Sequence, residues 1–222
     1  MNQNNDKDNN IFPKWANYVP GIIFLSIGLL LGTIVFIFWY WFSPKNLNVG
    51  YEPDQPIPFS HRLHVSDVGL DCRYCHNMVD EKAHSNIPDT ETCMNCHSVI
   101  KQDSEHIKKI KASYEEDQPI EWVKVHQLPE YAYFNHSRHV NSGVSCVTCH
   151  GRVDQMDVVR QVQPLSMGWC LDCHRDPEPF LRPKDKVTQL GWISEEDQKV
   201  LGKRLKKQYH IDPKQDCMTC HR

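Results

Sequence analysis

Residues 59–76 read FSHRLHVSDVGLDCRYCH, and residues 134–150 return to the same pattern as FNHSRHVNSGVSCVTCH. Each stretch holds F-x-H-x-x-H-V, followed by C-x-x-C-H. The second histidine of the pair precedes the first cysteine by eight residues in the first copy and by seven in the second. A segment that recurs with its histidines and cysteines in the same order indicates two copies of one structural unit.

The chain has ten cysteines, and all of them occur in pairs with two intervening residues. These pairs are Cys72/Cys75, Cys93/Cys96, Cys146/Cys149, Cys170/Cys173 and Cys217/Cys220. Disulfides would not require the histidine that follows every second cysteine. Zinc ribbons separate their pairs by roughly 15–20 residues, which suits the first four pairs but leaves the fifth pair without a partner.

Covalent haem accounts for both the pairs and the histidines. In C-x-x-C-H the two thiols bond to the porphyrin and the adjacent histidine binds the iron. Five such motifs predict five covalently bound haem c groups. The predicted proximal iron ligands are His76, His97, His150, His174 and His221.

The remaining histidines are candidates for the opposite face of each iron. In the repeated pairs His61/His64 and His136/His139, a spacing of three puts both imidazoles on one side of a helical turn. Because two histidines so placed cannot share one iron face, each pair is predicted to serve two different haems. The fifth distal ligand is predicted to be His126, and the alternatives are Met156, His210 and His84.

The repeats also predict the organisation of the domain. We expect a first dihaem module over 57–97, a connector over 98–131, a second dihaem module over 132–174 and a single-haem segment over 175–222. No strand-rich segment is evident, so a mainly α fold with much irregular loop is expected. Ile100, Ile107, Ile110 and Tyr114 predict one apolar stripe of an amphipathic helix in the connector. Ser194 with Asp197 resembles the capping box of a later helix.

An uncharged stretch over 22–42 lies near the N-terminus. As a helix it spans roughly 32 Å, enough to cross a bilayer. We predict a cytoplasmic tail over 1–18, a single transmembrane helix over 19–43 and a haem domain over 44–222. Haem attachment of this kind takes place outside the bacterial cytoplasm, so the domain should face the periplasm from the inner membrane. A cleaved signal peptide is the alternative, but no small-residue cleavage site follows the apolar stretch.

The formal charge is -3, and the basic residues do not gather as a nucleic-acid surface would require. Nucleic acid is therefore not an expected partner.

The segments FSHRLHV, DCRYCH, ETCMNCH, YFNHSRHV, CVTCHGRVDQM, GWCLDCHRDPEPF and DCMTCHR resemble class III multihaem cytochromes. More closely, the whole chain resembles the pentahaem cytochrome c subunits of alternative complex III, a bacterial quinol:electron-acceptor oxidoreductase. That resemblance implies a membrane complex with an iron–sulfur subunit, quinol-binding integral membrane subunits, a monohaem cytochrome c and, in some cases, a terminal oxidase. It also implies a subunit that passes electrons on and is not an enzyme by itself.

We therefore expect an electron-transfer subunit that delivers electrons from a quinol-oxidising complex to a periplasmic cytochrome c or a terminal oxidase. One alternative is a catalytic multihaem reductase, which would need an iron with an open position. Another is a stand-alone membrane quinol dehydrogenase that feeds a periplasmic reductase. That protein should carry a haem motif close to the membrane helix, whereas twenty-nine residues separate Phe42 from Cys72.

Overall fold

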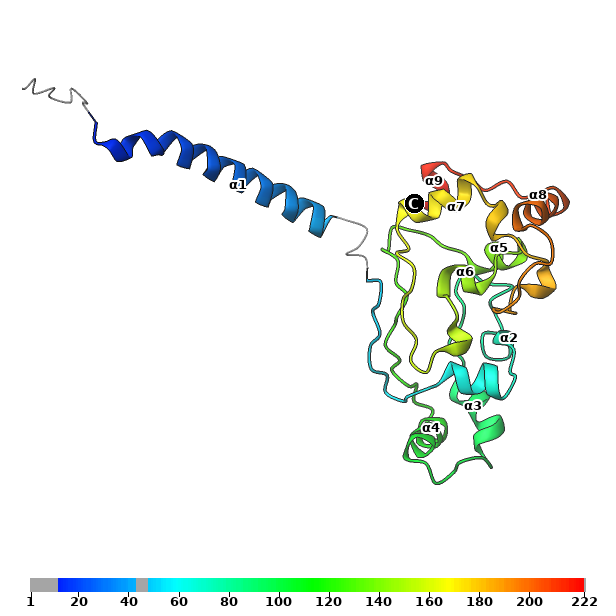
Figure 1. Cartoon of the computed structure of the whole chain (residues 1–222). Coiled ribbons are helices and arrows are strands. Elements are labelled where there is room, and N and C mark those ends of the chain that lie inside the picture. Colours follow the sequence, from blue (N-terminus) through cyan, green and yellow to red (C-terminus); the bar gives the residue numbers. More distant parts are fainter. Residues whose placement is uncertain (1–11, 43–47, 222) are drawn as a thin grey trace, which may run out of the picture. The chain divides into compact units, whose positions relative to one another are not determined.

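The computed structural model describes residues 12–42 and 48–221. The chain divides into two units, Met1–Asn46 and Leu47–Arg222 (Figure 1). The first unit contains a short 3-10 helix, η1 (Lys14–Tyr18), followed by α1 (Val19–Trp41). Residues 1–11 of the predicted tail and residue 43 of the predicted membrane helix lie outside the described residues.

Helix α1 is apolar around its whole circumference. The helical stretch Lys14–Trp41 is 28 residues long with a mean hydropathy of 2.6, which is long and apolar enough to cross a membrane. The side chains of α1 are exposed, as illustrated by Phe24, which is 81% exposed. Membrane anchors and signal sequences share these properties of length and composition.

The second unit consists of short helices joined by long irregular segments, and it has no named strand within residues 48–221 (Figure 1). Its α-helices are α2 (Cys72–Cys75), α3 (Thr90–His97), α4 (Glu105–Glu115), α5 (His136–Asn141), α6 (Cys146–His150), α7 (Met167–Arg175), α8 (Gln198–Gln208) and α9 (Cys217–Cys220). The other helical turns are the π-helix η3 (Arg62–Asp67) and the 3-10 helices η4 (Val153–Gln155), η5 (Glu178–Phe180) and η6 (Lys184–Lys186). The mainly α fold with much irregular loop is thus confirmed.

The apolar core of this unit is divided into three small clusters. Each cluster has three buried residues: Ile57, Ile107 and Ile110; Val79, Val140 and Val187; Leu181, Leu201 and Leu205. The predicted connector helix is confirmed as α4, with Ile107 and Ile110 on its buried side. The stripe is shorter than predicted, because Ile100 precedes the helix and both Ile100 and Tyr114 are exposed. The described part of this unit is therefore held by several small apolar clusters rather than by one large core.

The predicted capping box at Ser194 is wrong. The carboxylate of Asp197 accepts hydrogen bonds from the backbone N–H groups of Lys199 and Val200, so α8 begins at Gln198. Ser194 instead accepts a hydrogen bond from the backbone N–H of Glu196, which is a local turn. Aspartate is as good an N-cap as serine, and here it lies nearer to the apolar residues of the helix.

The two repeated segments place their phenylalanine and histidine rings in the same arrangement, although the first forms the π-helix η3 and the second the α-helix α5. The Phe59 ring stacks on His64 at 4.3 Å between centroids, and the Phe134 ring stacks on His139 at 4.4 Å. Each phenylalanine also meets the first histidine of its own pair edge-on, at 4.9 Å for His61 and 4.7 Å for His136. The aromatic residue two positions before each pair therefore fixes both imidazoles.

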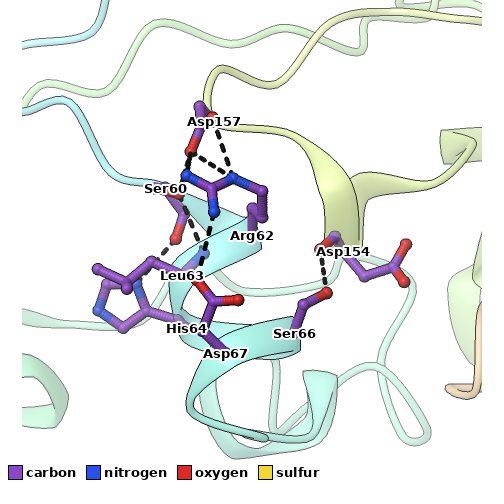
Figure 2. Close-up of polar contacts among 8 residues, drawn as sticks. All are labelled: Ser60, Arg62, Leu63, His64, Ser66, Asp67, Asp154 and Asp157. Carbon is purple, nitrogen blue, oxygen red and sulfur yellow. Dashed lines mark hydrogen bonds and ion pairs between the residues drawn. The ribbon is translucent and has the colours of Figure 1, made fainter.

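The two copies bind each other through reciprocal hydrogen bonds. The backbone N–H of Arg62 donates to the carbonyl of Met156 at 3.0 Å, and that of Ser137 donates to the carbonyl of Lys82 at 3.2 Å. Both donors follow the first histidine of their pair by one residue, and both acceptors follow the C-x-x-C-H histidine of the other copy by six. The side chains of Ser66 and Asn141 donate to the carbonyls of Asp154 and Asp80. Both donors follow the first histidine of their pair by five residues, and both acceptors follow the C-x-x-C-H histidine of the other copy by four. Figure 2 shows the first copy's side of this contact, where Ser60 and Arg62 also bind the Asp157 carboxylate. Equivalent residues exchanging equivalent bonds give the two copies an internal pseudo-twofold relation.

Candidate haem-binding site

Every C-x-x-C-H motif forms one helical turn. In α2, α6 and α9 the first cysteine is the first residue of the helix, whereas in α3 and α7 it is the fourth. Aspartate or serine side chains cap four of these five helices, as Asp71 does by accepting from the backbone N–H of Arg73. Because residues three apart share one face of a helical turn, both thiols of each pair point to the same side. That arrangement suits two covalent bonds to a single planar group.

Three pairs of imidazoles lie at the separation that one iron would require. A metal–imidazole bond of about 2 Å puts each ring centroid roughly 3 Å from the metal, so rings on opposite faces lie about 6 Å apart. Each pair joins a histidine of F-x-H-x-x-H to a C-x-x-C-H histidine of the same module. The centroid distances are 6.2 Å for His64/His97, 6.4 Å for His136/His150 and 6.1 Å for His139/His174.

The fourth candidate pair is His61 with His76. Burial, together with the nearby His76 and His64, lowers the pKa of His61 to about 4. The imidazole is therefore neutral at neutral pH, as a metal ligand must be. Its Nδ1 is buried without a hydrogen-bond partner, so this side chain is not yet satisfied by protein alone.

Most of these imidazoles have their Nδ1 atom turned to a backbone carbonyl. Among the proximal candidates, Nδ1 of His76 lies 2.7 Å from the carbonyl of Asn86, and Nδ1 of His174 lies 2.7 Å from the carbonyl of Lys214. Nδ1 of His97 and Nδ1 of His221 lie 3.1 Å from the carbonyls of Ile100 and Tyr131. Among the distal candidates, His64, His136 and His139 meet the carbonyls of Ser60, Ala83 and Asn135 at 2.8–2.9 Å. An Nδ1–H that donates to a carbonyl fixes the tautomer with a lone pair on Nε2, the atom that binds iron.

Among the proximal candidates, His150 is the exception. Its Nδ1 lies 3.3 Å from Nε2 of His126, with the rings nearly perpendicular at 80° and their centroids 4.4 Å apart. Burial lowers the pKa of His150 to about 3, so this ring is also neutral.

The thiols show how the five motifs follow one another in space. The thiols of Cys72 and Cys146 lie close together: the neighbouring Cys146 thiol raises the pKa of Cys72, and the Cys72 thiol lowers that of Cys146. Three further pairs of thiols from different motifs are also neighbours. Burial and the nearby Cys75 raise the pKa of Cys93, and burial and the nearby Cys220 raise that of Cys170. Burial and the nearby Cys173 raise the pKa of Cys149 to about 12. The resulting order of motifs is second, first, third, fourth, fifth. Figure 1 agrees, since α3 lies toward one end of this unit and α7 and α9 toward the other.

The cysteines are not arranged for disulfides or for zinc. All ten lie among the described residues and all are free thiols. Over residues 12–42 and 48–221, no three cysteine, histidine or acidic side chains converge as a metal ion would need. Free thiols paired on one side of a helical turn, with a histidine directly after each pair, fit the edge of a macrocycle instead.

Two family models match the second unit in succession. The model for "Class III cytochrome C family" matches residues 42–130, and the model for "Cytochrome c7 and related cytochrome c" matches residues 132–222. The fold is that of a multihaem cytochrome c. The division between the two matches falls where the second copy of the repeat begins.

A curated relative points to the same class. The chain is 30% identical over 118 residues to the "Menaquinone reductase, multiheme cytochrome c subunit" of Nitratidesulfovibrio vulgaris (strain Hildenborough). The match covers 53% of this chain and 54% of that protein, so the chain spans about half the length of the curated relative it matches.

The residues of this multihaem cytochrome fit covalent haem c. The thiols of each pair share one face of a helical turn, and three imidazole pairs at 6.1–6.4 Å have the spacing of axial ligands. The three reserve candidates are placed differently. Met156 is buried, whereas His84 and His210 are exposed, and His210 has a φ of 54° at the residue that follows the C-cap of α8. His221 lies beside Tyr131, whose ring centroid is 5.8 Å from that of His221 and whose carbonyl is 3.1 Å from its Nδ1.

Proposed function

We propose that this chain is a pentahaem cytochrome c that carries electrons within a membrane-bound quinol-oxidising complex of the alternative complex III type. When bound, haem c supplies reversible one-electron chemistry, and the protein's part is to attach it, ligate it and set its surroundings. The observation that carries the proposal is the set of three imidazole pairs at 6.1–6.4 Å.

That geometry supports three of the ligand pairs, and His61 is paired with His76 because His76 lies close enough to lower its pKa. We assign His61 with His76, His64 with His97, His136 with His150 and His139 with His174, and each imidazole keeps its lone pair on Nε2. For the fifth iron, beside His221, the distal candidates are His126, Met156, His210 and His84. The ten cysteines named above would form the thioether bonds, two to each haem.

The order of the motifs supports a role in electron transfer along the molecule. The second and fifth motifs lie at the two ends of the series, and each of them contributes one exposed cysteine, Cys96 and Cys217, whereas the other eight are at least partly buried. The chain's own residues therefore leave the two end motifs closest to solvent, where partners can approach. The proposed partners are an iron–sulfur subunit, quinol-binding membrane subunits and a monohaem cytochrome c.

The location is also part of the proposal. We assign α1 as a single-pass anchor in the bacterial inner membrane, because its apolar side chains are exposed all round. The haem domain then lies in the periplasm, where c-type haem is attached.

The curated relative supports a second candidate function. Its name states a menaquinone reductase, so the same residues would serve transfer of electrons toward the quinone rather than away from quinol. Both candidates need the five haems and differ in the direction of electron flow.

Two measurements test the proposal. The mass of the mature full-length chain should exceed that of the polypeptide by five haems, and the Cys217→Ala/Cys220→Ala variant should lose one of the five. The complex purified in mild detergent should reduce its haems with quinol, whereas the chain alone should not. A mature chain with free thiols, or fast quinol-driven reduction of the isolated chain, would contradict the proposal.

A further inference from the structure

His126 lies in a half-buried segment that is held in place three residues earlier. The side-chain amide of Gln55 binds the backbone of Val123 at both ends: its Nε2 donates to the Val123 carbonyl at 2.9 Å, and its Oε1 accepts from the Val123 N–H at 2.9 Å. Trp122 packs against the cluster of Ile57, Ile107 and Ile110. The backbone just before His126 is therefore held by Gln55 and by the cluster that Trp122 packs against.

The hydrogen bond between His126 and His150 has a defined direction. If Nε2 of His150 faces iron, its proton is on Nδ1, so Nδ1–H is the donor and Nε2 of His126 is the acceptor. Nε2 of His126 is then occupied, and its own proton is on Nδ1. With the two ring centroids only 4.4 Å apart, His126 cannot lie opposite His150 across one iron, where His136 already lies at 6.4 Å.

We propose that His126 is a positioning residue of the third haem site, which accepts a hydrogen bond from Nδ1–H of the proximal ligand His150. The inference rests on the proposed haem ligation. It assigns to His126 the role that backbone carbonyls have at the other four proximal histidines, and it removes His126 from the candidates for the fifth distal ligand.

An imidazole nitrogen is a stronger base than an amide carbonyl, so this acceptor draws more electron density toward His150. A more electron-rich proximal ligand stabilises the oxidised iron relative to the reduced iron. The third haem should therefore have a lower reduction potential than it would with a carbonyl acceptor. Loss of an outer-shell partner of a metal ligand typically changes the affected equilibrium at least tenfold, which for one electron is roughly 59 mV.

The test uses the full-length haem-loaded chain in detergent. His126→Leu removes the acceptor, His126→Gln keeps an amide oxygen that can accept, and His106→Leu on the exposed side of α4 is the matched control. We expect five low-spin haems in all three proteins by low-temperature electron paramagnetic resonance. In a spectropotentiometric titration, one of the five potentials should rise by roughly 59 mV in His126→Leu, should partly return in His126→Gln and should not move in the control.

Two results would overturn the inference. A high-spin ferric signal in His126→Leu would make His126 an iron ligand, and unchanged potentials would show that it does not act on His150. If His126→Leu yields no folded protein, Gln55→Ala decides, because loosening Val123 should shift the same potential in the same direction by less. A chain without covalent haem would refute the proposed function instead, and the mass measurement distinguishes that case.

Discussion

Gly202 offers a quantitative test of how α8 is attached to the fourth haem motif. An added Cβ at this residue would lie 1.9 Å from the carbonyl oxygen of Glu178, 2.6 Å from its carbonyl carbon and 2.9 Å from its Cα. Ordinary contact begins at 3.4 Å, and backbone atoms cannot rotate away as a side chain would. The change Gly202→Ala must therefore separate α8 from η5, the turn that follows α7.

The cost can be worked from the residues on this contact. Moving α8 outward also loosens Leu201 and Leu205, which are 3% and 4% exposed and pack with the fully buried Leu181. Overpacking of this kind costs about 1–3 kcal/mol, and the higher helix propensity of alanine offsets up to about 1 kcal/mol of it. We expect a net loss of about 1–2 kcal/mol in the free energy of unfolding, which lowers Tm by roughly 2–8 °C for a domain of this size.

The matched control is Gly168→Ala in α7, where an added Cβ meets nothing within 4 Å. That variant should be unchanged, or more stable by at most about 1 kcal/mol. Thermal unfolding of the haem-loaded chain, followed by far-ultraviolet circular dichroism, compares the two. A Tm for Gly202→Ala equal to or above that of Gly168→Ala would refute the close packing of α8 on η5.

Two more predictions concern the ligands and the helix caps. His139→Ala should convert one haem, that of Cys170/Cys173, to high spin in low-temperature electron paramagnetic resonance, whereas His106→Ala should leave all five low-spin; an unchanged His139→Ala spectrum would remove His139 from the ligands. At α9, the Thr219 hydroxyl and N–H donate to Asp216 and lower its pKa below the ordinary 3.8. A lowered pKa in the folded state means that this cap stabilises the fold at neutral pH and is lost as the pH falls through 3.8 and below. The pH dependence of the free energy of unfolding that comes from the Asp216 cap should therefore be absent in Asp216→Asn. An identical pH profile for both proteins would contradict the role of Asp216 as this cap.

The sequence predicts the chemistry of the site better than its geometry. The C-x-x-C-H motifs, the histidine pairs and the duplication are local patterns, and local patterns survive folding because each occupies one helical turn. Even Ser60 and Asn135 carry a signal that sequence inspection missed. Both are residues of the N-cap type one position before the first histidine of each pair, and their side chains accept from the backbone N–H groups of Leu63 and Arg138.

The hydrogen-bond partners of the imidazoles could not be predicted from the sequence. Five of the acceptors of Nδ1–H are carbonyls that lie outside the F-x-H-x-x-H turns, such as that of Lys214, forty residues from His174. Any residue has a carbonyl, so composition and spacing carry no trace of these bonds. The sequence predicts His126 as a ligand because apolar and aromatic residues surround it. Burial alone cannot distinguish an imidazole that faces a metal from one that faces another imidazole.

The pseudo-twofold relation between the modules is broken by one loop of the single-haem segment. Asp71 and Ser145 occupy equivalent positions, immediately before the first cysteine of α2 and of α6. Asp71 accepts a hydrogen bond from the Thr188 hydroxyl at 2.7 Å, and Ser145 donates to the carbonyl of the neighbouring Val187, also at 2.7 Å. The same short loop thus binds both modules where the thiols of Cys72 and Cys146 meet. A single loop on a twofold axis cannot contact both sides in the same way, which explains why one position is an acceptor that caps its helix and the other a donor that leaves α6 without a side-chain cap. Two equal modules alone would present identical ends. The segment 175–222 instead adds a fifth motif beyond the fourth, so that the two end motifs of the series differ in the helices that surround them and offer different surfaces to partners.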